Sequence, residues 1–251
     1  MMTRSRMMQP MLDWLLRPAR EQPQVSVDGR TLPVVLRRTA TARRMTMRLA
    51  PDGSEVRVTL PRWGGSAEAL DFVRSKADWL ASQLTRLPAP TNLGEGTVVH
   101  YIGRQLVLRH DPARPRRVRL TGEELHIGGP AESLASRLTR WLETEARAVL
   151  ADDLAFYCAR ADQPVPRLML SRAQRRWGSC AGDGTIRINW RLIMAPEPVR
   201  RSVVAHEVAH LVHFDHSERF HALLRSIYEH DIRAANGWLK REGRSLYTLL
   251  G

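Results

Sequence analysis

The sequence predicts an α+β fold, in which a mostly β region precedes a mostly helical region with a small sheet. Apolar residues alternate with a period of two in the first half of the chain and recur at helical spacing in much of the second half. The sequence Gly-Gly-Pro at residues 128–130 marks the change. We expect a tail over residues 1–24, a β-rich region over 25–130 and a second domain over 131–251.

Four β-hairpins are predicted in the β-rich region. Their turns fall at short sequences that contain glycine, which adopts the positive φ that tight turns require. These sequences are Asp28-Gly29, Pro51-Asp52-Gly53, Ile102-Gly103 and Thr121-Gly122. No repeat with a fixed, solenoid-like period is visible, so we interpret this region as successive hairpins.

A helix over residues 66–84 separates the second hairpin from the third. Ser66 can cap this helix, and Leu70, Val73 and Leu80 form an apolar stripe along it. Residues 87–96 contain proline and glycine and are interpreted as a linker or long loop.

The second half of the chain is predicted to be mainly helical. A long amphipathic helix is expected over residues 132–161, and two short strands are expected over 167–171 and 185–189. A further helix begins at Pro196, because proline suits the first turn of a helix, and runs to about His213. The remaining helices are expected near residues 217–228 and 231–242.

The composition is that of an ordinary globular protein. Hydrophobic residues make up 43% and charged residues 26% of the chain, and there are only two cysteines, which excludes a disulfide scaffold. No apolar run is long enough to span a membrane, and the basic N-terminal stretch lacks the apolar segment of a signal peptide. We therefore expect a cytoplasmic protein without a membrane span.

The charge is strongly positive. Lysine and arginine number 39 against 26 aspartate and glutamate residues, which gives a formal net charge of +13, and all but Lys76 and Lys240 of the basic residues are arginine. Such a surface attracts phosphates, nucleic acid or acidic lipid. Because the arginines are spread along the chain, codon usage explains them equally well, and the densest patches, at 114–119 and 172–176, are short.

Six of the nine histidines fall between residues 206 and 230, and two of them form the motif His-Glu-x-x-His. On a helix, His206 and His210 project to the same side, about 40° apart, and can share one cation. Glu207 lies about 100° from His206, from where it can reach a water on the metal without binding the metal itself. Val204 and Val208 point to the opposite face, which can pack into the core.

A catalytic zinc usually has three protein ligands and one open position. The candidates for the third ligand come after the motif: His213, Asp215, His216, Glu218 and His221. A chain that turns after the helix can bring His216 back to the metal. The side chain of His213 lies about 5 Å further along the helix axis, which favours an exposed position or a hydrogen bond to a ligand.

Four motifs of the second half occur together in a fixed order. Trp-Gly-Ser-Cys occupies residues 177–180, a Gly-x-Ile-x-x-Asn strand ends at Asn189, the His-Glu-x-x-His motif is next, and Asp-His-Ser-x-x-Phe occupies 215–220. In these motifs the chain resembles the YgjP-like metallopeptidase domain, which is related to the SprT-like zinc peptidases. The resemblance implies a zincin-like helical domain, with His206, His210 and His216 as zinc ligands and Glu207 as the catalytic base.

The resemblance also implies hydrolysis of peptides or unfolded proteins. The Trp-Gly-Ser-Cys loop and the strand over 185–189 would lie beside the motif helix and can bind an extended peptide by strand addition. The candidate substrate-binding residues are Arg176, Trp177, Gly178, Ser179 and Asn189. Two of these residues can have a structural role instead of binding substrate: Trp177 can be a core aromatic, and Asn189 can end the strand. Cys180 is better interpreted as a small buried thiol than as a metal ligand.

Three other functions use the same residues. A nucleotide pyrophosphohydrolase would direct the activated water to phosphorus, and Arg172, Arg175 and Arg176 precede the loop with guanidinium groups suited to phosphate. A nucleic-acid-associated SprT-like protease would use the basic surface for targeting. A metal-binding module without turnover would have no need of Glu207.

Overall fold

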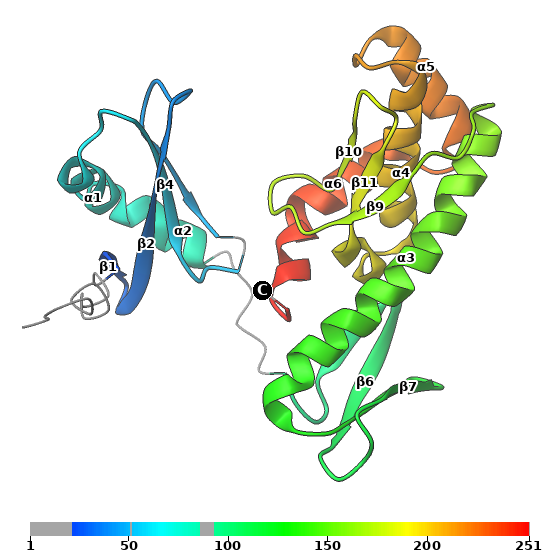
Figure 1. Ribbon diagram of the computed structural model, residues 1–251, viewed down its shortest axis with the longest axis horizontal. Coiled ribbons are helices and arrows are strands. Elements are labelled where there is room, and N and C mark those ends of the chain that lie inside the picture. Colours follow the sequence, from blue (N-terminus) through cyan, green and yellow to red (C-terminus); the bar gives the residue numbers. More distant parts are fainter. Residues whose placement is uncertain (1–21, 51, 86–92, 251) are drawn as a thin grey trace, which may run out of the picture. The chain divides into compact units, whose positions relative to one another are not determined.

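The computed structural model describes residues 22–50, 52–85 and 93–250, and the chain divides into two compact units, residues 1–86 and 87–251 (Figure 1). Almost all of the predicted tail and most of the predicted linker lie outside the described residues. The α+β fold is confirmed, with strands dominating the first part of the chain and helices the second.

The first unit contains a four-stranded sheet of order β1-β2-β4-β3. Its central strands β2 and β4 are parallel, and each edge strand is antiparallel to its neighbour. The strands are β1 (Gln24–Val27), β2 (Arg30–Thr39), β3 (Thr46–Leu49) and β4 (Val56–Pro61). Because β2 and β4 pair directly, β3 lies at the edge of the sheet, an arrangement that hairpin patterns alone do not reveal.

The helix predicted over 66–84 is two helices, α1 (Ser66–Arg74) and α2 (Ala77–Thr85). The break falls at Ser75, whose hydroxyl donates to the carbonyl of Phe72. Both helices contact the sheet and bury small and branched apolar side chains against it. The fully buried residues of this core are Val56, Val58, Leu60, Ala69, Val73 and Leu80.

The second unit begins with a sheet of the same topology, of order β5-β6-β8-β7 with a parallel central pair. Its strands are β5 (Val98–Tyr101), β6 (Arg104–Asp111), β7 (Val118–Thr121) and β8 (Glu124–Gly128). The first hairpin of each sheet turns through two residues with positive φ, Asp28-Gly29 in one and Ile102-Gly103 in the other. The chain therefore contains one four-stranded arrangement twice, although no fixed-period repeat is visible in its sequence.

A 27-residue helix, α3 (Leu134–Arg160), joins this second sheet to the rest of the unit (Figure 1). The hydroxyl of Tyr101 on β5 donates to the Glu145 carboxylate at 2.6 Å, and one apolar cluster includes both Leu108 of β6 and Leu138 of α3. The boundary expected near residue 130 falls inside this cluster. The structure divides the chain at residue 86 instead, because α3 shares its core with the sheet before it.

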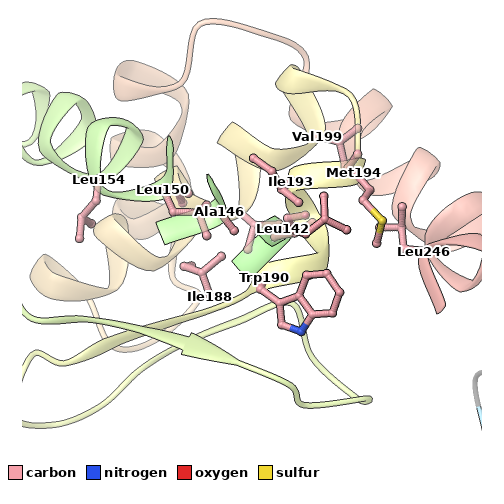
Figure 2. Packing of buried hydrophobic residues seen from close by; sticks show 14 of the residues in the cluster. Leu142, Ala146, Leu150, Leu154, Ile188, Trp190, Ile193, Met194, Val199 and Leu246 are labelled. Carbon is pink, nitrogen blue, oxygen red and sulfur yellow. The ribbon is translucent and has the colours of Figure 1, made fainter. Parts of the chain in front are cut away.

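A small third sheet comes next, of order β10-β11-β9. Strands β9 (Leu168–Ser171) and β11 (Ile186–Asn189) are the two predicted strands, whereas β10 (Gly178–Cys180) falls in a segment predicted to be a loop. The remaining elements are η1 (Ala131–Ser133), η2 (Trp190–Met194), α4 (Glu197–Val212), α5 (Glu218–Ile227), α6 (Ile232–Glu242) and η3 (Gly243–Tyr247). Figure 2 shows Leu142 and Leu150 of α3 in the core together with Ile188 of β11 and Ile193 of η2.

Candidate metal centre

Helix α4 carries the His-Glu-x-x-His motif in the interior of the second unit. Its first turn contains Glu197 and Pro198, so it begins where the sequence predicts. The sequence predicts one buried face, but Val199, Val203, Val204 and Val208 are all buried, on both sides of the helix. The reason is that α3, α5, α6 and β10 all pack around α4.

Three imidazoles converge at the C-terminal end of α4. The Nε2 atoms of His206 and His210 lie 3.2 Å apart, and the Nε2 atom of His216 lies 3.3 Å from that of His206. The chain leaves the helix at His213, which has extended φ and ψ, and returns His216 to the other two rings. Ligand atoms of all three residues lie within 4.8 Å of one another.

These nitrogen atoms fit a shared metal ion. Two ligands at about 2.0–2.1 Å from a tetrahedral zinc lie about 3.3 Å from each other, close to the observed separations. Burial, followed by the neighbouring imidazoles of His210 and His216, lowers the pKa of His206 to about 4, so this ring is neutral at pH 7, as a metal ligand must be. Three imidazoles with Nε2 facing Nε2 are thus arranged as a ligand set.

Two further contacts orient the histidine rings. The Nδ1 atom of His210 lies 2.9 Å from the backbone oxygen of His213, a contact in which Nδ1 donates and leaves Nε2 free for a metal. Phe220 of α5 is fully buried, and its ring centroid lies 5.0, 4.6 and 4.9 Å from those of His206, His210 and His216. Phe220 therefore supports all three rings from one side.

The other residues considered for a third ligand lie outside the cluster. His213 contributes its backbone oxygen, Glu218 pairs with Arg225, and Asp215 accepts from the backbone N–H of Ser217. The ring of His221 lies 6.4 Å from that of His216. Among the described residues, the group able to hold a metal consists of His206, His210 and His216.

Glu207 is buried on α4 against strand β10. Burial raises the pKa of its carboxyl to about 7, while the backbone N–H of Cys180 and the charge of Arg176 act in the opposite direction. A Cβ atom at Gly178 would overlap the Glu207 carboxylate, so the close approach of this strand to the helix requires glycine. Gly178 is thus essential to the packing of Glu207.

The other candidate substrate-binding residues have different surroundings. Arg176 is exposed and Ser179 is half-buried in β10. Trp177 packs against Tyr247 of η3, with ring centroids 5.7 Å apart. Asn189 is fully buried, and its side chain donates to the backbone oxygen of Ala173 at 2.8 Å and accepts from the N–H of Arg191 at 3.1 Å. These contacts give Asn189 a structural role at the end of β11.

Sequence reasoning missed the contribution of the C-terminal segment. The amide of Asn189 also lies 3.1 Å from the Tyr247 hydroxyl, and that hydroxyl lies 3.2 Å from the Ala173 carbonyl oxygen. The guanidinium group of Arg191 lies 4.6 Å from the ring centroids of both Trp190 and Tyr247. Residues in η3 therefore fix the loop that precedes β10. No local pattern near residue 247 indicates this role, because its partners are 56 or more residues away.

Comparison with protein families gives a match over residues 43–242 to the model of the YgjP-like metallopeptidase domain. This match covers most of the chain. The chain belongs to the YgjP-like metallopeptidase family. No curated protein and no solved structure matches it.

Membership of the YgjP-like family makes this protein a metallopeptidase-type hydrolase, with peptides as the expected class of substrate. The family also implies a metal, and the three converging imidazoles fit one. The match ends at the last residue of α6, so Tyr247 and the rest of η3 lie beyond it. In the described part of the chain, no helix combines the length and apolar character needed to cross a membrane.

Proposed function

We propose that this YgjP-like protein is a zinc peptidase in which His206, His210 and His216 hold the metal and Glu207 is the general base. The convergence of the three Nε2 atoms at the helix that also carries the buried Glu207 is the observation that carries the proposal. Bound zinc would supply Lewis-acid polarisation of the scissile carbonyl and of the attacking water.

Glu207 would move the protons of the reaction. Its carboxylate takes a proton from the attacking water and passes it to the leaving nitrogen of the peptide. A pKa raised by burial suits both steps, because the group can accept and release a proton near neutral pH. The backbone N–H of Cys180 orients the carboxylate while it does so.

Strand β10 would bind the substrate. The backbone oxygen of Trp177 accepts from Asn189, and the N–H of Ala181 donates to the oxygen of Thr185, so these odd-numbered positions are bonded towards β11. The alternation turns the backbone groups of Gly178 and Cys180 to the other edge, next to Glu207. The Cys180 N–H is engaged by Glu207, so an extended peptide would pair with the remaining backbone groups of this edge, those of Gly178 and the Cys180 oxygen, and place its scissile bond at the metal.

Metal content tests the ligand set. Wild type is expected to carry about one zinc per chain, and His210→Ala and His216→Ala are each expected to lose most of it. His213→Ala is the matched control, because only the backbone oxygen of His213 contacts the cluster, and it should retain the metal. Elemental analysis and zinc titration measure the effect, and equal zinc content in all four proteins would refute the ligand set.

Glu207→Gln tests the base. The amide keeps the size of the side chain but cannot accept a proton, so zinc should be retained while hydrolysis of unfolded casein falls by roughly 100-fold or more. Loss of zinc from this variant would give Glu207 a structural role instead.

Arg172 does not support the pyrophosphohydrolase alternative, in which it would bind a phosphate group. Its guanidinium forms a two-pronged contact with Glu143 of α3, at 2.7 and 2.9 Å, and is not free for a phosphate. Turnover of nucleoside triphosphates by wild type, dependent on Glu207 and without proteolysis, would reverse this preference.

A further inference from the structure

A cavity of about 670 Å³ lies on the sheet formed by β5 to β8. It opens on the face that α3 does not cover, because Leu108 and Leu125 point into the core shared with α3 and their neighbours along the strands point the other way. Figure 1 shows this sheet beside the N-terminal half of α3. The C-terminal end of α3 instead contacts α5, where Arg160 donates to the backbone oxygen of Ser226. The cavity is therefore separate from the metal centre.

Three basic residues cross the floor of the cavity, one from each of three neighbouring strands. Arg109 of β6 is the register partner of His126 of β8, and His126 is the partner of Arg119 of β7. Arg117 lines the same cavity just before β7 begins. His126 also contacts the Glu124 carboxylate at 3.2 Å, so within the described residues Arg119 is the member of this row that has no carboxylate partner.

The carboxylates in the cavity are already engaged. Arg109 lies between Glu95, at 3.2 Å, and Glu124, at 2.8 Å, and Asp111 pairs with Arg114 at 3.1 Å. Of the four arginines that line the cavity, Arg117 and Arg119 have no carboxylate partner in the part of the chain that the structure describes. Two exposed guanidinium groups therefore face a concave space without a counter-ion.

The wall of the cavity is fixed by the backbone. A Cβ atom at Gly128 would overlap the backbone oxygen of Pro115, so the loop between β6 and β7 lies directly against β8. The N–H of Gly128 donates to the oxygen of Arg117 at 3.3 Å, and the Asp111 carboxylate accepts from the N–H of Ala113 at 3.0 Å. These bonds fix the backbone at Arg117 before any ligand arrives, so the loop need not be ordered on binding.

We propose that this cavity binds a phosphate group, with Arg117 and Arg119 as its ligands. Guanidinium groups match the geometry and charge of phosphate oxygens, and the volume lies in the range of sites for small molecules. The phosphate can belong to a free phosphorylated compound or to a nucleic acid backbone. This site is independent of the peptidase proposal, because it uses none of the same residues.

Calorimetric titration of the 251-residue chain with two probes, inorganic pyrophosphate and a 12-nucleotide single-stranded DNA, tests the proposal. Arg119→Gln and Arg117→Gln should each raise the Kd of the bound probe by about tenfold or more, the scale of a lost hydrogen bond to a charged group. Arg116→Gln is the matched control, because it removes the same charge from the same loop but does not line the cavity. The control should change the Kd by less than about threefold.

The two probes identify the source of the phosphate. Tight binding of pyrophosphate that depends on Arg119 indicates a free phosphorylated ligand, and DNA binding that depends on Arg119 and weakens with salt indicates a nucleic acid. Two results would overturn the proposal: neither probe binds wild type, or the three variants change the Kd equally. Unchanged thermal melting of the variants shows that the fold is intact, which these exposed positions lead us to expect.

Discussion

The two units of this metallopeptidase contain the same four-stranded arrangement, but only the second arrangement leads to a metal centre. In both sheets, two hairpins place their inner strands side by side in parallel. The sheets differ in the helices that come after them: two nine-residue helices after the first sheet and the 27-residue α3 after the second. The same sheet can therefore pack against helices of different lengths. Only the longer helix, α3, extends beyond its sheet to the elements that form the metal centre.

The extra length of α3 has a clear physical use. Leu134, Leu138 and Leu142 belong to the half of the helix near the sheet, whereas Leu154 and Tyr157 lie near its C-terminal end, and all five are buried. Beyond the sheet, Asp153 receives the guanidinium group of Arg200 on α4 at 2.7 Å, with both side chains almost fully buried. One helix therefore spans the sheet core and the core around the metal helix, which α1 and α2 are too short to do.

The largest effect is expected from breaking the ion pair between α3 and α4. Asp153→Ala leaves the Arg200 charge buried without its partner, which should cost about 3–5 kcal/mol in the free energy of unfolding. Asp71→Ala in the first unit removes an exposed partner of Arg74 and should cost no more than about 0.5 kcal/mol. Urea denaturation compares the two, and similar losses would show that α3 does not hold α4 as we infer.

A pair of core truncations separates the two units. Leu142→Ala on α3 and Leu80→Ala on α2 each remove a fully buried side chain and should cost about 2–5 kcal/mol. Hydrogen exchange measured peptide by peptide should show lost protection only in the second unit for Leu142→Ala and only in the first for Leu80→Ala. Loss of protection throughout the chain in either variant would mean that the units unfold together.

The smallest effect is expected from removing the first unit. The apolar cluster around α3 and α4 consists of residues from Leu93 onwards, so a chain of residues 87–251 keeps the whole core of the metal centre. Zinc content per chain should equal that of the full protein within the error of elemental analysis. A clear fall in zinc content would show that the first unit contributes to the site.

Local patterns predicted the helices and most strands, and distant contacts account for what they missed. The helix expected over 132–161 is α3, and the expected strands over 167–171 and 185–189 are β9 and β11. Periodicity does not specify which strands pair, so the parallel central pairs and the strand β10 were not predicted. The division at residue 86, and not near residue 130, has the same cause, because α3 contacts β7 and β8 and shares one apolar cluster with their sheet.

In the candidate site, too, local spacing predicted some residues and contacts between distant residues account for the others. His206, Glu207 and His210 lie within one turn and a half of helix, so their spacing predicts a shared location. His216 was also proposed from sequence, and the structure brings its Nε2 atom to 3.3 Å from that of His206. Phe220 was visible as a motif residue without a role, and the contact between Tyr247 and Asn189, 58 residues apart, has no local signal.

The three imidazoles also come from one short stretch, in which His216 lies ten positions after His206. A chain that has lost its fold still keeps them near one another, so an ion can be chelated by the denatured ensemble as well. Binding to both states reduces the stabilisation that a metal confers. The apolar core around α3, built from residues distant in sequence, must then supply most of the folding energy, and a chelator should abolish turnover while leaving the protein folded.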